Sequence, residues 1–104
     1  MSVLTITDEN YETEIEKSDK VCVLDFYATW CGPCKMMSPV IDEIAEELGD
    51  MVKVGKVDSD ENRLLIEKFG IMSIPTIFVI KQGEIVKKFM GVTPKKDIIE
   101  AIKM

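Results

Sequence analysis

The chain has 104 residues, 46% of them hydrophobic and 31% charged, which suits one globular domain with a buried core and leaves no room for two. Its 19 acidic and 13 basic side chains give a net charge of −6 with no basic cluster, so nucleic acid is not expected as a partner. No apolar run is long enough to span a bilayer, the first residues lack a secretory signal, and three cysteines are too few for a disulfide scaffold. We therefore expect a single domain over residues 1–104 that works in the cytoplasm, away from membranes.

Strand and helix patterns alternate along the chain. The run 21–28 is almost continuously apolar, which is typical of a strand covered on both faces in the middle of a sheet. Residues 32–48 carry apolar side chains at helical spacing, and Pro39 inside that segment predicts a kink. Further on, Gln82-Gly83 separates two strand patterns and predicts a hairpin. In chain order the predicted elements are a strand at 3–6, a helix capped by Thr7, a strand at 21–28, a helix at 32–48, a strand at 51–57, a helix from Ser59 to Phe69, strands at 76–80 and 84–90, and a last helix after Thr93-Pro94.

This order of elements predicts an α/β fold whose sheet is parallel in part and carries helices on its faces. Such sheets place their functional sites where the carboxyl end of a central strand meets the start of a helix. Cys31 lies at that point, in the sequence WCGPC, which follows the apolar run almost directly.

Cys31 and Cys34 are spaced so that a disulfide can close across the first turn of the helix. Helix geometry puts their Cα atoms about 5 Å apart, inside the usual range for a disulfide. So small a ring constrains the unfolded chain only slightly, which makes the bond a poor staple. A helix N-terminus also presents unpaired N–H groups, which favour thiolate over thiol. We expect Cys31, at the tip and nearer to solvent, to attack a target disulfide and Cys34 to resolve the mixed disulfide.

The residues around the pair bear on its chemistry. Pro33 has no N–H to offer a sulfur, so the thiolates should be less stabilised and the couple should favour the role of a reductant. Two other interpretations remain open. A closed zinc or iron–sulfur site needs four ligands, and with three cysteines and no histidine a metal would have to be shared between two chains. The pair could also be inert, although we expect redox chemistry and no metal.

WCGPC is part of an ordered set of motifs that closely resembles the thioredoxin family over the whole chain. A bare CxxC has little specificity, whereas five motifs in this order and spacing have much more. As they stand here, the motifs are VLDFYATWCGPCK with Asp25, Pro39 in the helix that follows, KVDSDEN with Lys56, IMSIPTIFVIKQGE with Pro75 and Gly83, and Gly91 before the last helix.

The resemblance implies a three-layer α/β/α sandwich, with a central mixed sheet of about five strands flanked by four helices. It implies a general protein-disulfide reductase that acts as a monomer and binds no cofactor of its own. Electrons would arrive from a flavin-containing thioredoxin reductase and would leave to ribonucleotide reductase, peroxiredoxins or methionine sulfoxide reductases. The alternatives are a disulfide oxidase or isomerase on the same fold and a binding module whose thiols are idle.

Asp25 is an isolated acid within the apolar run. Burial should raise its pKa, and the resemblance implies that its carboxylate takes the proton of Cys34 when that thiol attacks. The alternative is an acid that reaches solvent at a strand edge. Lys56 either pairs with Asp25 and tunes this transfer or is a solvated strand lysine, and Lys35 is expected to be an exposed helical lysine.

The resemblance also implies a docking surface around Cys31. The bond between Ile74 and Pro75 would be cis and face the cysteines, and the backbone of Ile74 would pair with an extended substrate. Trp30 is either an aromatic anchor of this surface or a core aromatic. The expected substrate-binding residues are Trp30, Gly32, Pro33, Ile74, Pro75, Gly91 and Val92.

Two positions depart from the family pattern. Tyr27 stands where many relatives have Trp, which should not alter the chemistry. Cys22 lies outside the family motif, and we expect it to be a small buried apolar side chain. The seven methionines are expected to fill the core, although any exposed ones would be oxidisable.

Overall fold

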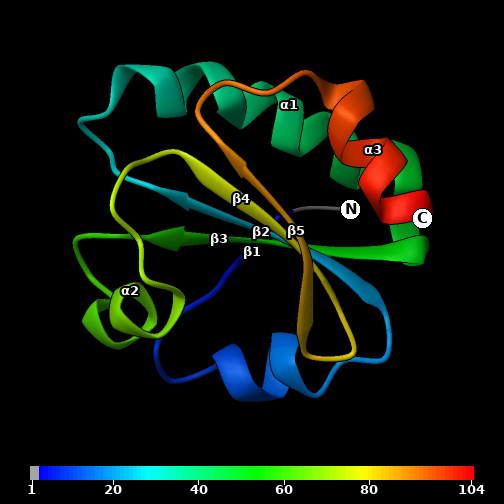
Figure 1. Cartoon of the computed structure of the whole chain (residues 1–104), viewed down its shortest axis with the longest axis horizontal. Coiled ribbons are helices and arrows are strands. Elements are labelled where there is room, and N and C mark those ends of the chain that lie inside the picture. Colours follow the sequence, from blue (N-terminus) through cyan, green and yellow to red (C-terminus); the bar gives the residue numbers. More distant parts are fainter. Residues whose placement is uncertain (1–2) are drawn as a thin grey trace.

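The computed structural model describes residues 3–104, and its middle layer is a mixed β-sheet (Figure 1). The strands are β1 (Leu4–Thr5), β2 (Val21–Tyr27), β3 (Val52–Asp58), β4 (Thr76–Lys81) and β5 (Glu84–Met90). Their order across the sheet is β1-β3-β2-β4-β5, with β1 and β2 parallel to β3. β4 is antiparallel to both of its neighbours, β2 and β5. The predicted central strand is therefore in the middle of the sheet.

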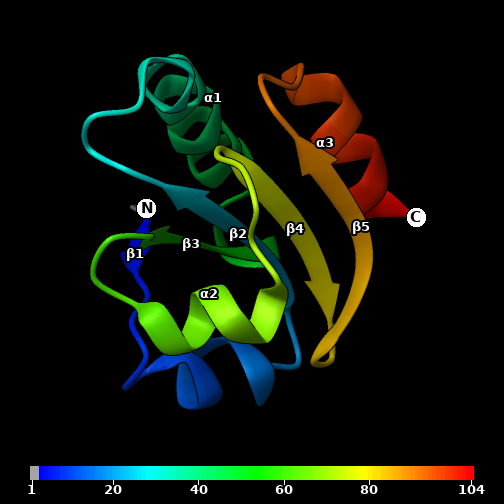
Figure 2. The same cartoon turned by 60° about the vertical axis from the view of Figure 1, so that its left-hand side comes forward.

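Helices cover both faces of this sheet, as Figures 1 and 2 show. They are α1 (Gly32–Leu48), α2 (Arg63–Phe69) and α3 (Lys95–Lys103), with a π-helical turn at Glu12–Glu16 and a 3₁₀ turn at Gly49–Met51. α1 and α3 pack on one face, and α2 and the π-helical turn pack on the other. The predicted three-layer sandwich is confirmed, with the π-helical turn as its fourth helix. Within residues 3–104, no helix is long and apolar enough to cross a membrane.

Each face of the sheet has its own hydrophobic core, and β2 contributes to both. Val23 packs with α1 and α3, whereas Leu24 and Phe26 pack with α2 and the π-helical turn. All five inner residues of β2 are buried, including its one acid, Asp25. The near-continuous apolar run thus reflects a strand that is covered on both sides.

One local signal in the sequence is confirmed, and another only in part. The Oγ1 of Thr7 accepts the N–H of Asn10 at 3.3 Å, and the Oδ1 of Asn10 accepts the N–H of Thr7 at 2.8 Å, which closes the turn before the first helical segment. The N-cap residue of that segment is Tyr11, which makes no side-chain cap. That segment continues as a π-helical turn instead of an α-helix. Gln82 and Gly83 have φ values of 51° and 80°, as a two-residue hairpin turn requires.

The start of α2 differs from the prediction. Asn62 is the N-cap residue but makes no side-chain cap, and the N–H groups of Leu64 and Leu65 donate to the carboxylate of Asp8 at 3.3 and 3.0 Å. The predicted start at Ser59 is therefore wrong. The partner that satisfies the first N–H groups of this helix comes from a distant segment, and local sequence patterns do not reveal it.

β3 is packed tightly against its neighbours at Gly55. This residue is the Cα partner of Leu4 on β1 and of Leu24 on β2. A Cβ atom placed on Gly55 would lie 2.5 Å from Cγ1 of Ile6, whose side chain is fully buried. The close approach therefore excludes a side chain at this position.

Gly55→Ala should lower the free energy of unfolding by about 1–3 kcal/mol, because the added methyl group overpacks against Ile6. Urea unfolding of the disulfide-bonded protein measures the loss. Ile6→Ala is the matched control, since it removes the atoms that clash, and the double variant should lose less than the two single variants added together. Strictly additive losses would show that this contact is not what excludes a side chain.

Candidate active site

The two cysteines lie where β2 gives way to α1, as predicted. Cys31 is the N-cap residue of α1, Cys34 lies in its first turn, and the two are joined by a disulfide with a Cα separation of 5.2 Å. The N–H of Cys34 points at the Sγ of Cys31 at 3.2 Å. The first turn of the helix therefore directs an N–H group at the sulfur of Cys31, where it would stabilise a thiolate.

The surroundings of the two sulfurs differ more than their exposure does. In the disulfide form Cys31 is 5% exposed and Cys34 is 4% exposed, so accessibility alone does not separate them. The Sγ of Cys31 lies 3.9 Å from the carbonyl oxygen of Ile74 in the loop before β4. Cys34 instead lines a pocket on the other side, together with Asp25.

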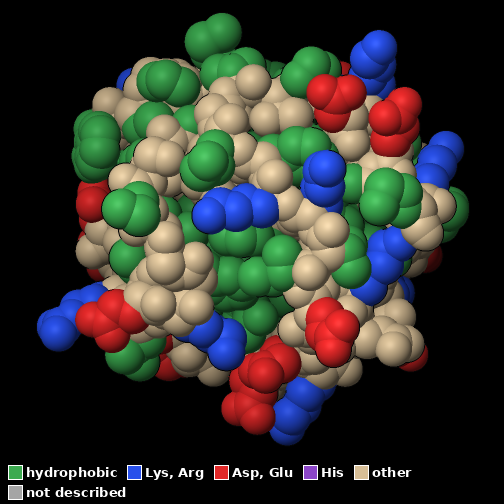
Figure 3. All heavy atoms as spheres, viewed as in Figure 1, with side chains coloured by type: hydrophobic (Ala, Val, Ile, Leu, Met, Phe, Trp, Pro, Cys, Tyr) green, Lys and Arg blue, Asp and Glu red, His purple; other side chains and the backbone are tan. Residues whose placement is uncertain are grey.

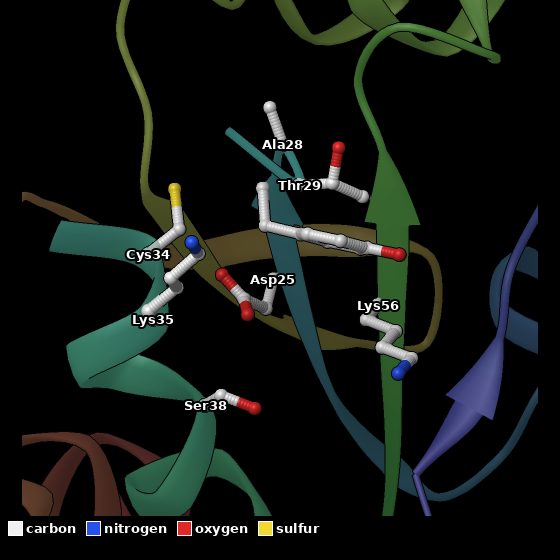
Figure 4. A pocket seen from close by; sticks show the side chains of 8 residues that line it. Asp25, Ala28, Thr29, Cys34, Lys35, Ser38 and Lys56 are labelled. Carbon is white, nitrogen blue, oxygen red and sulfur yellow. The ribbon is translucent and has the colours of Figure 1, made fainter. Parts of the chain in front are cut away.

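That pocket has a volume of about 250 Å³ and lies between β2, β3 and the start of α1. Figure 4 shows the side chain of Asp25, from β2, and that of Cys34, from α1, beside the same space. The residues that line it are Asp25, Tyr27, Ala28, Thr29, Cys34, Lys35, Ser38 and Lys56. Lys35 is exposed, as expected of a helical lysine.

Asp25 is a buried acid with a strongly shifted pKa. Its side chain is 4% exposed, and its Oδ1 has no hydrogen-bond partner among the described residues. Burial raises its pKa from 3.8 to about 7, and the positive charge of Lys56 opposes this shift in part. The prediction of a buried acid with a raised pKa is confirmed, and the alternative of an acid reaching solvent at a strand edge is wrong.

Lys56 lies next to Asp25 in the sheet, but their side chains are not paired. The two residues are Cα partners on the parallel strands β3 and β2, and both line the pocket. They form no direct ion pair, and the Nζ of Lys56 lies 5.8 Å from the centroid of the Tyr27 ring. The influence of Lys56 on Asp25 is therefore electrostatic and acts across the pocket.

The loops on the other side of the disulfide meet beside Cys31. The bond between Ile74 and Pro75 is cis, as the resemblance implied. Ile74 is half-buried against the two cysteines, whereas Pro75 is buried. The carbonyl oxygen of Pro75 accepts the N–H of Gly91 at 2.8 Å, which joins the loop before β4 to the loop after β5.

Trp30 is 68% exposed, so it is not a core aromatic. Its indole N–H donates to the Oδ2 of Asp60 at 2.8 Å, which fixes the ring at the surface. Val92 is also exposed, and Gly91 has a φ of 83°, which favours glycine. Sequence reasoning missed Asp60, which the prediction placed within the helix from Ser59 to Phe69.

The predicted docking residues thus lie at one end of the molecule. Gly32 and Pro33 are exposed next to Cys31, and Ile74 and Gly91 reach the same place from the two loops. Figure 3 shows exposed hydrophobic side chains at the upper left, where α1 begins, and most of the charged side chains elsewhere on this face. Among residues 3–104, no cluster of three or more His, Cys, Asp or Glu side chains is placed to hold a metal ion.

A disulfide across one helical turn adds little stability, so we infer that it functions by being opened and closed. The fold and site therefore define a thiol-disulfide oxidoreductase. The family model described as Thioredoxin matches residues 2–104. The chain is 43% identical to "Thioredoxin" of Bacillus subtilis, over 98% of this chain and 96% of that protein. It is 46% identical to "Thioredoxin" of Listeria monocytogenes, over 96% and 95% of the two chains, and 41% identical to "Thioredoxin" of Pyropia yezoensis, over 98% and 95%. The chain belongs to the thioredoxin family and is a thiol-disulfide reductase that exchanges electrons with disulfide-containing proteins.

Asp25→Asn should stabilise the protein at high pH and have little effect near pH 4. Because the pKa of Asp25 is about 7 when folded and near 3.8 when unfolded, the folded state holds the extra proton between these values, and its stability falls as the pH rises through that window. Above pH 7 the variant should be more stable than the parent protein by on the order of 4 kcal/mol.

Urea unfolding of the disulfide form at pH 4.5 and at pH 8 measures this difference. Asp42→Asn, on the exposed side of α1, controls for the loss of one carboxylate outside the pocket. A stabilisation of equal size at both pH values would contradict the assignment of the raised pKa to Asp25.

Proposed function

We propose that this reductase acts on protein disulfides in general, with Cys31 as the attacking cysteine and Cys34 as the resolving one. The Cys31 thiolate attacks one sulfur of the target, which breaks the target S–S bond and forms a mixed disulfide. Cys34 then attacks the sulfur of Cys31, which closes the Cys31–Cys34 disulfide and releases the second target sulfur as a thiolate. Two electrons pass to the target, and the two cysteines are oxidised.

The observation that carries this assignment is the difference between the two sides of the disulfide. Cys31 is the N-cap of α1 and receives the N–H of Cys34, an environment that favours its thiolate. It also lies 3.9 Å from the carbonyl oxygen of Ile74, which is half-buried. Cys34 lies on the pocket side, where a base is available.

Asp25 is the proposed base for the resolving step. A carboxylate whose pKa is about 7 can accept the proton of Cys34 and return it to solvent near neutral pH. Lys56 acts as a tuning charge, because it lowers the pKa of Asp25 from across the pocket. The pocket itself gives the proton a path to solvent beside Ser38 and Lys35.

The lifetime of the mixed disulfide tests these roles. With a protein disulfide as target, Cys34→Ser should accumulate a persistent mixed disulfide, and Cys31→Ser should form none. Asp25→Asn should form it at a normal rate and resolve it about tenfold or more slowly at pH 7, since general-base assistance is lost. Rapid acid quenching and intact-mass measurement give the time course. Trapping on Cys34 in the Cys31→Ser variant, or normal resolution by Asp25→Asn, would contradict the assignment.

Substrate proteins are proposed to dock on the surface around Cys31. The carbonyl oxygen of the half-buried Ile74 lies beside the sulfur, and an extended substrate segment would pair with the Ile74 backbone as an added strand. The hydrogen bond between Gly91 and Pro75 holds the loop before β4 in place. Trp30 and Val92, with Gly32 and Pro33, supply the exposed apolar area around it.

Ile74→Asp should raise KM for a protein disulfide about tenfold while leaving the reduction of a small aromatic disulfide nearly unchanged, because only the protein substrate buries this position. Steady-state kinetics with insulin and with the small disulfide separate the two effects. Ile85→Asp is the matched control, because Ile85 is an exposed isoleucine on β5 paired with the far end of β4. Equal losses on both substrates would rule out the docking role.

The proposed donor is a flavin-containing thioredoxin reductase, and the proposed targets include ribonucleotide reductase, peroxiredoxins and methionine sulfoxide reductases. The protein is proposed to work in the cytoplasm, where thiols are kept reduced, as a monomer with one domain over residues 1–104.

Pro33 favours a reductant over an oxidase or isomerase, because it offers the sulfurs no N–H. Redox titration followed by Trp30 fluorescence distinguishes a reductant from an oxidase, because an oxidase would have a much higher reduction potential.

A further inference from the structure

The methionines of this chain are mostly at the surface. Met37 is fully buried, but five of the six methionines among residues 3–104 have exposed fractions from 64% to 97%. The expectation that methionines fill the core is therefore wrong for Met36, Met51, Met72, Met90 and Met104. Exposed thioethers are open to oxidants, so their positions show which parts of the surface oxidation would alter.

Three of the exposed methionines flank the disulfide. Met36 follows Cys34 by two residues on α1, and Met72 precedes Ile74 by two residues, with 97% of its surface exposed. Met90 ends β5 as the Cα partner of the first residue of β4 and directly precedes the loop joined to Pro75. We call Met36, Met72 and Met90 the methionine rim.

The other two exposed methionines lie at the opposite end of the molecule. Met51 comes just after the C-terminus of α1, and a helix of 17 residues separates its two ends by about 25 Å. Met104 follows α3 at the C-terminus, which Figure 1 shows on the far side from the start of α1. The chain thus contains its own internal control for any effect of oxidation.

We propose that the methionine rim is an oxidation site that controls the affinity of the reductase for protein disulfides. The proposal rests on the docking surface described under Proposed function. Oxidation of Met36, Met72 and Met90 by a peroxide makes the edge of that surface polar and weakens docking. The dithiol chemistry of Cys31 and Cys34 is left intact.

The step needs only hydrogen peroxide and the thioether. A lone pair on the methionine sulfur attacks one peroxide oxygen, and the O–O bond breaks. The sulfur gains that oxygen and is oxidised by two electrons, while the departing hydroxide takes a proton and leaves as water. The product, methionine sulfoxide, carries a strong hydrogen-bond acceptor that has to lose its water when a substrate covers it.

Among residues 3–104, the structure protects the other sulfurs from the same reagent. In the disulfide form Cys31 and Cys34 have no free thiol, and Cys22 is buried. Met37 is fully buried, and its Sδ accepts the N–H of Thr93 at 3.3 Å. Peroxide treatment of the disulfide form therefore targets the exposed methionines.

The experiment treats the disulfide form with hydrogen peroxide, removes the peroxide with catalase, and maps sulfoxides by peptide mass spectrometry. The protein is then reduced with dithiothreitol, which leaves sulfoxides in place, and assayed with insulin and with a small aromatic disulfide. Met36, Met72 and Met90 should carry sulfoxides and Met37 should not. KM for insulin should rise roughly three- to tenfold, with the small-disulfide rate unchanged.

Two variants locate the effect. In the triple variant Met36→Leu, Met72→Leu and Met90→Leu, the treated and untreated protein should have the same KM for insulin. In the double variant Met51→Leu and Met104→Leu, treatment should still raise KM as much as in the parent protein. An unchanged KM in treated parent protein, or protection by the double variant, would overturn the proposal.

The same assays distinguish a failure of this proposal from a failure of the docking surface on which it rests. If Ile74→Asp fails to discriminate insulin from the small disulfide, the docking surface itself is wrong and the rim proposal falls with it. If Ile74→Asp does discriminate but peroxide leaves KM unchanged, only the rim proposal fails.

Discussion

A carboxylate buried in the middle of the sheet is the constraint on which the rest of the site depends. Asp25 is on β2, which is covered on both faces, so its charged form is disfavoured and its pKa lies close to neutrality. The hydrophobic cores on either side of β2 hold the acid there despite that penalty. Because β2 ends at Tyr27 and α1 begins at Gly32, the same strand also fixes the position of the cysteine pair.

The disulfide separates two environments for which we propose different tasks. On one side, Cys31 lies beside the helix start and the linked loops before β4 and after β5, with Ile74 packed against it. On the other side, Cys34 lines a pocket together with Asp25 and Lys56. The proposed roles in recognition and in proton transfer can therefore be tested independently, because no residue named for docking also lines the pocket.

Features that depend on neighbours in the sequence were predictable, and features that depend on distant partners were not. The central strand, the cysteine pair on a helix start and the buried acid followed from local patterns, and the cis bond before Pro75 followed from the family resemblance. The cap of α2 by Asp8 and the anchoring of Trp30 by Asp60 join residues 30 or more positions apart, which no local pattern encodes. The exposure of the methionines was missed because this side chain suits a core as well as a surface.

The hydrogen bond between Trp30 and Asp60 links the motif to a part of the chain that has no chemistry of its own. Asp60 belongs to the loop that ends at Asn62, whose amide donates to the carbonyl of Asp58 and accepts the N–H of Asp8. Hydrogen bonds therefore connect the indole, through the loop that ends at Asn62, to a segment near the N-terminus. A scaffold that received the five residues WCGPC alone would acquire the dithiol and the indole, but it would lack the Asp60 carboxylate that holds the ring in place.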